Sequence, residues 1–336
     1  MEKIPDLRIV GDASEEAKAK ERQTIEARLT DHVASLSETE QKALERLEYP
    51  KSPEELSLID FANEESNRLR AEAGVESYDI PYANYHIIPP ESYKKIDPEG
   101  NSSATSRVTE QGMVFRADYF RGNLVYFGSV AFHETLHLKS HVTFEVSEKD
   151  KKIKSTIYRQ GVTVRATQKK GLNSEYHSHF DGLHEAIVSA QEKISLSNMM
   201  QLPVLQTERE RLSSEEAVKL KKIISEKKDI PLDDIIWVGE KENEYETISY
   251  SRQRAVLRYV CEEIQKDFSD QYQTPEDVYK EFLKAQFTGQ ILPIARLVEG
   301  AFGEGSFRLL SNMKTDKESG VLTLEALKKE RIRAKK

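Results

Sequence analysis

Residues 123–140 read NLVYFGSVAFHETLHLKS and contain the run His133-Glu134-Thr135-Leu136-His137. The apolar residues of this stretch predict a buried helix. On a helix, side chains four residues apart lie above one another, about 6 Å apart, so His133 and His137 can bind one cation. Glu134 lies beside them, where its carboxylate can accept a proton from a water molecule. The stretch therefore predicts a helix that carries both a metal site and a general base.

Zinc is the metal that this pattern favours. Zn²⁺ takes neutral imidazole nitrogens at about 2.0–2.1 Å, and a catalytic site keeps one position open for water. The ion lowers the pKa of that water toward about 7, which yields a nucleophile at neutral pH. Six of the eight histidines lie between residues 133 and 184, which strengthens the metal-site interpretation of the motif.

A catalytic zinc site needs a third protein ligand from elsewhere in the chain. HETLH at residues 133–137, followed by LHEAIVSA at 183–190, resembles the gluzincin arrangement of zincin metallopeptidases. There a glutamate on a second helix binds the metal, and the resemblance implies Glu185 in that role. Near a helix N-terminus the macrodipole favours the ionised carboxylate that a metal requires. The hairpin sequence YRQG at residues 158–161 is also similar to that of uncharacterised bacterial predicted zincins.

The chain departs from the gluzincin pattern at two positions. Many gluzincins have an acidic residue four positions after the ligand glutamate, where it orients a metal-bound histidine, but this chain has Ser189. The position before the glutamate is His184, where asparagine is common. Both differences bear on the assignment of Glu185 as the third ligand.

Other residues compete for the role of third ligand. His141 continues the four-residue spacing, but it lies two turns from His133, about 12 Å along a straight helix. It also lacks the metzincin spacing. His177, His179 and His184 remain alternatives, as in zincins with three histidines, and are otherwise expected in a polar loop that lines the cleft. Asp181 is expected to cap the glutamate helix, with orientation of a metal-bound histidine as its alternative role.

Hydrolysis of an amide also needs a group that stabilises the charge on the carbonyl oxygen. A tyrosine can serve, and the possible residues are Tyr158, Tyr176, Tyr245 and Tyr250. Tyr250 is favoured because it opens the predicted helix SYSRQRAVLRYV after the glutamate helix. Its alternative role is an aromatic residue that packs against the core at a helix start.

Composition limits the other function classes. The net charge of −8 gives no support for binding nucleic acid, and no stretch approaches the roughly 20 apolar residues that span a bilayer. The first residues lack the basic and apolar segments of a secretory signal. A single cysteine, Cys261, excludes a disulfide within the chain and is typical of a reducing compartment. We therefore expect a cytoplasmic protein that binds neither nucleic acid nor membrane.

The predicted fold class is α+β, in three regions. Residues 1–75 form a helical N-terminal extension, with a capping box at Ser37 and Glu40 and a further helix from Ser52-Pro53 to Gly74. Residues 76–200 form a zincin-like core with strands, active-site helix and glutamate helix, and Gln160-Gly161 marks a hairpin turn. Residues 201–336 form a mostly helical part of the catalytic unit.

These features predict a hydrolase, specifically a zinc metallopeptidase that cleaves a peptide or an unfolded protein segment with Glu134 as general base. An extended substrate is expected to pair with an edge strand from GMVFRADYF, residues 112–120. One alternative is a non-catalytic zinc-binding or protein-interaction module, but such a site has no need of the base Glu134. The other is a zinc hydrolase of a non-peptide amide, which nothing in the sequence excludes. The sequence predicts no oligomeric state.

Overall fold

The predicted central helix is present as α6 (Leu124–Leu138). The computed structural model describes residues 4, 7–30, 38, 41–42, 48–96, 102–120, 122–149, 152–170 and 173–336. The helix begins where the Asn123 side chain accepts a hydrogen bond from the amide of Tyr126. Twelve of its fifteen residues are buried. A helix that is apolar on nearly every side requires neighbours on every side, and this places α6 in the interior.

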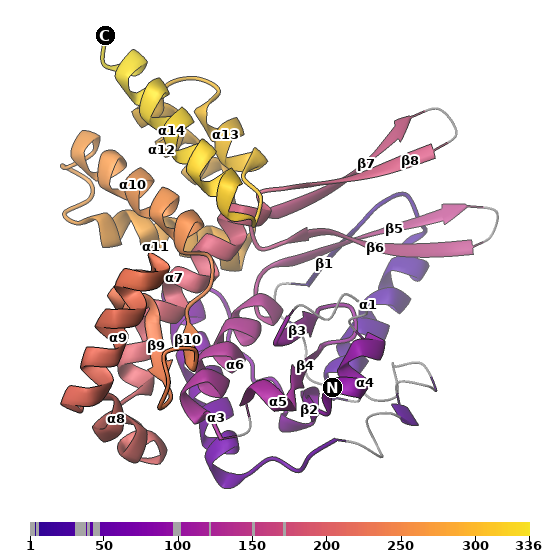
Figure 1. The fold of residues 1–336 in the computed structure, drawn as a ribbon. Coiled ribbons are helices and arrows are strands. Elements are labelled where there is room, and N and C mark those ends of the chain that lie inside the picture. The colour runs from indigo at the N-terminus through magenta and orange to yellow at the C-terminus, as the bar shows by residue number, and fades with distance from the viewer. Residues whose placement is uncertain are drawn as a thin grey trace.

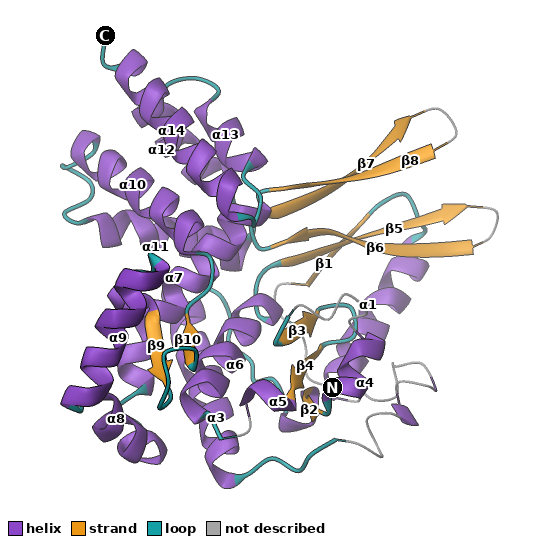
Figure 2. Ribbon diagram, viewed as in Figure 1, coloured by secondary structure: helices purple, strands orange, loops and turns teal. Residues whose placement is uncertain are grey.

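The mixed α+β class is confirmed (Figures 1 and 2). Further helices lie both before and after α6 in the sequence. They are α1 (Glu15–Thr30), α3 (Pro53–Glu72), α4 (Pro90–Ile96), α5 (Ala117–Phe120), α7 (Asp181–Met199), α8 (Gln206–Leu212), α9 (Glu215–Lys228), α10 (Ser251–Asp267), α11 (Pro275–Thr288), α12 (Leu292–Phe302), α13 (Ser306–Asn312) and α14 (Lys317–Ala334). None of the helices in the described ranges has the length and apolar character needed to cross a membrane.

A small sheet packs beside α6 and consists of β2 (Tyr85–Ile88), β4 (Gly112–Arg116) and β3 (Ala104–Arg107), in that order. β2 runs parallel to β4, and β3 runs antiparallel to it. The prediction of an edge strand in residues 112–120 is therefore wrong. β4 is the central strand, with partners on both sides, and the chain turns into the short helix α5 directly after it. Among the described residues, β3 pairs only with β4, and it packs against α6.

The larger sheet has the order β1-β5-β6-β7-β8 and is built from two hairpins. Its strands are β1 (Leu7–Val10), β5 (Val142–Lys149), β6 (Lys152–Gln160), β7 (Thr163–Lys170) and β8 (Asn173–His179). Figure 1 shows the β5–β6 and β7–β8 hairpins as two long ribbons that extend from the helical body on the same side. Along their described lengths β6 and β7 pair only at their base, next to the connecting turn.

The turn between β6 and β7 was predicted at Gln160-Gly161, and the structure confirms it. Gln160 pairs with Thr163, which leaves a two-residue loop of Gly161 and Val162. Gly161 has φ +55°, in the left-handed region that such loops require and that glycine adopts without strain. This turn returns the chain to the level of α6, so that α7 can begin beside it.

The N-terminal region contains a strand that the sequence analysis did not predict. β1 pairs in parallel with β5, from Leu7 opposite Val142 to Val10 opposite Glu145. The helix α3 begins as predicted, with Ser52 and Glu55 forming a capping box and Pro53 in the first turn. The predicted capping box at Ser37 and Glu40 lies outside the described residues.

The C-terminal region is mostly helical, as predicted, and α11 begins with a capping box at Thr274 and Asp277. Two short strands there were not predicted. They are β9 (Ile235–Val238) and β10 (Tyr245–Thr247), which form an antiparallel pair. The division of the chain into regions at residues 75 and 200 stays a prediction.

Candidate metal centre

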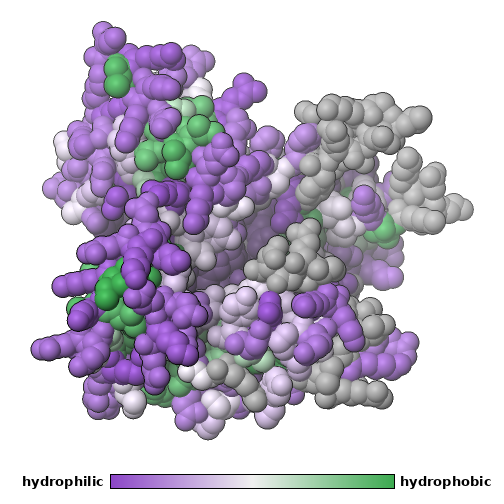
Figure 3. Space-filling view, viewed as in Figure 1, coloured by the Kyte–Doolittle hydropathy of each residue, from purple (hydrophilic) through white to green (hydrophobic). Residues whose placement is uncertain are grey.

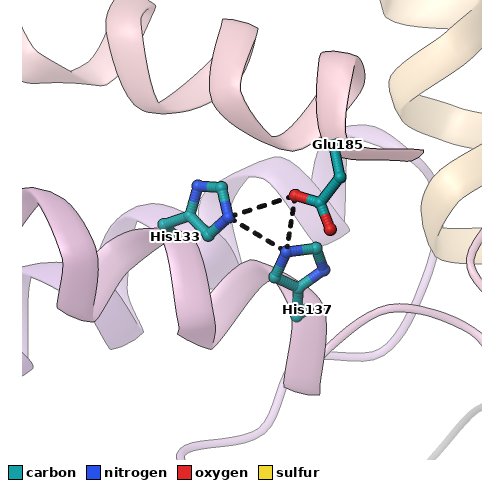
Figure 4. A group of neighbouring side chains, drawn as sticks. All are labelled: His133, His137 and Glu185. Atoms are coloured by element: carbon teal, nitrogen blue, oxygen red, sulfur yellow. Dashed lines mark hydrogen bonds and ion pairs between the residues drawn. The ribbon is translucent and has the colours of Figure 1, made fainter. Parts of the chain in front are cut away.

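The side chains of His133, His137 and Glu185 converge between α6 and α7 (Figure 4). Both histidines project from one face of α6, and the carboxylate reaches down from the first turns of α7. The Nε2 atoms of the two histidines are 3.0 Å apart. Glu185 Oε2 lies 3.4 Å from His133 Nε2 and 3.3 Å from His137 Nε2. Three ligand atoms predicted from the sequence thus face one common point.

The second nitrogen of each histidine is held by a partner on α7. His133 Nδ1 lies 2.9 Å from Glu192 Oε2, and His137 Nδ1 lies 2.7 Å from His184 Nε2. A carboxylate accepts hydrogen bonds, so His133 Nδ1 donates to Glu192 Oε2. His133 Nε2 faces the point that Glu185 also faces, where it can bind a proton or a metal ion.

A cation fits the point where these atoms meet. Glu185 Oε2 is buried and has no hydrogen-bond partner among the described residues. A lone-pair nitrogen beside a buried carboxylate oxygen is unfavourable unless a proton or a metal ion lies between them. Within the described ranges, the only group of three or more possible ligands is His133, His137 and Glu185. These residues could hold a metal ion.

The electrostatics of the cluster agree with this fit. Burial lowers the pKa of His133, but the carboxylates of Glu185 and Glu192 outweigh it and raise that pKa well above its usual value. Burial raises the pKa of Glu185, but the two histidines hold it well below its usual range. The carboxylate of Glu185 is thus ionised, which is the form that binds a metal.

Glu192 is a site residue that the sequence analysis missed. It lies seven positions after Glu185, two turns along the same face of α7, and Ser129 of α6 donates a hydrogen bond of 2.5 Å to its other oxygen. Ser189, at the position where gluzincins have an acid, instead donates to the backbone oxygen of Glu185. A search for acids at both the fourth and the seventh positions would have found Glu192.

The His184 side chain contacts His137 and is not one of the three groups that converge as possible metal ligands. Its ring stacks on that of His137, with the centroids 4.7 Å apart, and burial and the charge of His137 lower its pKa to about 3. The His184 ring is neutral at physiological pH, and its Nε2 can accept a hydrogen bond from His137 Nδ1 when His137 Nε2 binds a metal ion. His184 therefore orients a possible ligand.

The predicted base and electrophile both line one cavity with the three possible ligands. Glu134 is 9% exposed. The Tyr250 ring stacks near His133, with centroids 6.3 Å apart, and burial together with Glu185 and Glu134 raises its pKa. Tyr250 has φ +61° at the start of α10, a strained value for a tyrosine. It is the only tyrosine among the described residues that line the cavity, and the side chain of Tyr176 lies outside the described part.

The cavity has a volume of about 300 Å³ and is walled by α6, α7, β3 and the base of β6 and β7. In Figure 3 this face of the molecule is hollowed in the middle of the view, and the hollow is mostly hydrophilic. The residues that line the cavity are Ser102, Ala104, Thr105, Ser106, His133, Glu134, His137, Gln160, Thr163, Arg165, Asp181, His184, Glu185 and Tyr250.

Comparison with known proteins found no matching family model, no matching curated protein and no matching solved structure. The functional inference therefore rests on the geometry of the cavity and its side chains.

The other residues considered as ligands have different surroundings. His141 lies beyond the end of α6, and its Nε2 lies 2.9 Å from Thr143 Oγ1. His177 and His179 belong to β8, so the prediction of a polar loop there is wrong. Asp181 is the first residue of α7 and not its cap, which is Phe180. Its carboxylate accepts from Ser178 and lies 3.5 Å from Lys314 Nζ, so it does not orient a histidine.

Proposed function

We propose that this chain is a zinc-dependent hydrolase that cleaves peptide bonds, with His133, His137 and Glu185 as zinc ligands. The observation that carries the proposal is the convergence of two imidazole nitrogens and a carboxylate oxygen on one point of a cavity that Glu134 also lines. Two nitrogens and one oxygen are a donor set that catalytic zinc sites use. The zincin-like core predicted from the sequence is part of this proposal.

Bound zinc would supply a water of lowered pKa and polarise the substrate carbonyl. Glu134 follows His133 on α6 and lines the same cavity, where its carboxylate can accept a proton from the attacking water. The same group can then give the proton to the leaving amine. Burial keeps the Tyr250 hydroxyl protonated, so it can donate a hydrogen bond to the negative charge that develops on the carbonyl oxygen.

The free edge of β3 supports an extended peptide as the substrate. Ala104, Thr105 and Ser106 line the cavity, and in the described part of the chain β3 pairs only with β4. An unpaired strand edge offers backbone N–H and C=O groups to an added strand. A peptide on this edge would lie next to the point that the three ligand atoms face.

Replacing Glu134 with glutamine tests the proposal. The amide is similar in shape but cannot accept a proton, so the Glu134→Gln variant should keep about one zinc per chain and lose roughly 10²–10⁴-fold in rate. Zinc is measured by elemental analysis, and hydrolysis with unfolded casein and with a mixed peptide library. Glu325→Gln changes an exposed glutamate on α14 and serves as the matched control.

Two results would contradict the proposal in different ways. Wild-type turnover in Glu134→Gln would place the base elsewhere. Full zinc loading of the wild type without hydrolysis of any peptide would favour the non-catalytic module or a non-peptide amide as substrate.

A further inference from the structure

The charged groups that line the cavity include a single strong cation. Three carboxylates face the cavity, from Glu134, Glu185 and Asp181, and Arg165 is the only lysine or arginine among the described residues that line it. Asp181 already contacts Lys314, and a divalent metal ion would balance Glu134 and Glu185, so these acids have countercharges without Arg165. The position of this guanidinium therefore calls for another explanation.

Strand geometry directs Arg165 into the cavity. Thr163 and Arg165 are two residues apart on β7, so they lie on the same face of the strand, and both line the cavity. Arg165 pairs with Ser178 of β8 and is half-buried. Arg165 and the three possible metal ligands thus line the same cavity.

No structural role accounts for this guanidinium. Among the described residues, Arg165 has no carboxylate within ion-pair distance and no hydrogen-bond partner. Cations nearby do have such roles, since Arg159 donates to the backbone oxygen of Gly289 and Lys314 donates to that of Ser178. Asp181, one of the acids on the cavity wall, already contacts Ser178 and Lys314.

We infer that Arg165 binds a carboxylate of the substrate, and this inference rests on the proposed zinc hydrolase. A guanidinium forms two parallel hydrogen bonds with a carboxylate, which fixes the orientation as well as the charge of the bound group. A phosphate dianion is less suitable, because the three acids of the cavity oppose a double negative charge more strongly than a single one. The carboxylate is either the C-terminus of a peptide or an aspartate or glutamate side chain near the scissile bond.

Monohydroxamates of dicarboxylic acids test this inference without turnover. The hydroxamate end binds zinc, and the free carboxylate reaches toward Arg165 over a chain of one to four methylene groups. Calorimetry on the zinc-loaded protein compares each acid with its primary amide, and acetohydroxamate gives the affinity of the zinc-binding end alone. For at least one chain length, the acid should bind about 10-fold or more tightly than the amide, because hydrogen bonds to charged groups are the strong ones.

The variants identify the group responsible. Arg165→Gln should remove the preference for the acid and leave acetohydroxamate binding unchanged. Lys154→Gln removes the same charge from an exposed position on β6 and should keep the preference. Equal binding of acids and amides by the wild type at every chain length, or an unchanged preference in Arg165→Gln, would overturn the inference. Failure of acetohydroxamate to bind would instead overturn the zinc site, and with it this inference.

Peptide substrates distinguish the two sources of the carboxylate. Two kinds of peptide pair are compared in wild type and Arg165→Gln. The members of one pair have a free or an amidated C-terminus, and those of the other have glutamate or glutamine on either side of the scissile bond. The source is the group whose neutralisation raises KM in the wild type but not in the variant. If Arg165 stabilised the transition state instead, Arg165→Gln would lower kcat equally for all peptides, and this result would count against the inference.

Discussion

Glu192 illustrates what can and cannot be predicted at the scale of single residues. His133, Glu134 and His137 could be predicted because their spacing on one helix fixes their geometry locally. Glu185 could be predicted only through the family resemblance. Glu192 could be recognised as an acid on the same face of α7, but its contact with His133 could not be predicted. The turn of α7 that meets His133 depends on how α6 and α7 cross, and this is a property of the packed molecule.

Loss of the Glu192 carboxylate should weaken metal binding without abolishing it. Glu192→Ala removes the acceptor that fixes the His133 ring, and such partners typically contribute about 10–100-fold in metal affinity. The zinc affinity of Glu192→Gln should lie between those of Glu192→Ala and the wild type, because the amide oxygen still accepts a hydrogen bond from His133 Nδ1. Competition with a chromophoric chelator measures the zinc affinity. Ser189→Ala is the control, and an equal loss in both variants would show that α7 had simply been disturbed.

Glu246 on β10 gives a prediction for stability against pH. Burial raises its pKa from 4.5 to about 7 in the folded state, so between these pH values the folded chain binds more protons than the unfolded chain. Its contribution to stability is therefore present below about pH 4.5 and is lost as the pH rises to 7. Glu246→Gln removes this loss. With allowance for partial exposure, the variant should be about 1–2 kcal/mol more stable than the wild type at pH 8.

Urea unfolding at pH 5 and pH 8 measures the effect of Glu246→Gln. The gain should be clearly smaller at pH 5, because the wild-type carboxyl is then protonated in the folded state. A gain that is the same at both pH values would show that the carboxyl of Glu246 does not titrate in this window.

At the scale of elements, the sequence predicted what local signals specify. The cap at Ser52, the turn at Gly161 and the helix α6 each depend on residues close together in the chain. The strands β1 and β8 were missed because their hydrogen-bond partners lie on other segments, and short segments such as LRIV have no decisive pattern of their own. The position of β4 in the middle of its sheet also depended on partners from elsewhere.

The first turn of α7 depends on a close backbone contact at Gly182. Its amide donates to the backbone oxygen of Met313, and a Cβ atom at this position would lie 2.6 Å from the backbone oxygen of Lys314. Gly182→Ala must therefore displace one of the two segments, at a cost of about 1–3 kcal/mol in the free energy of unfolding. Urea unfolding measures this loss in the free energy of unfolding. Ser197→Ala, at an exposed position on the same helix, should change stability by less than about 0.5 kcal/mol.

At the scale of the whole molecule, the metal centre lies where two hydrophobic cores meet. α6 contributes Val125 and Phe127 to one core and Phe132 and Leu136 to the other. The possible ligands come from α6 and α7, which pack against each other between these cores. No pattern in the sequence indicates that two cores share a helix, because the contacts involved are distant in the chain.

Zinc should stabilise the whole fold, since its ligands come from two helices that separate on unfolding. A ligand at about 100 times its dissociation constant contributes about 2.7 kcal/mol. The thermal midpoint of the wild type should rise with zinc and fall with EDTA, while His133→Ala, His137→Ala and Glu185→Ala should show no zinc-dependent rise. His177→Ala and His179→Ala are the controls and should respond like the wild type. A normal zinc response in Glu185→Ala would remove it from the ligand set.

The pairing of β1 with β5 also has a consequence for the order of events during protein synthesis. Leu7 pairs with Val142, about 135 residues later, and ribosomes add roughly 5–20 residues per second. The segment LRIV therefore exists for roughly 7–27 s before its partner strand has been made. An unpaired strand is prone to join a wrong chain, and a charged side chain on it opposes this. Arg8 lies in the middle of β1 and is exposed in the finished fold, so its charge protects the strand throughout that interval.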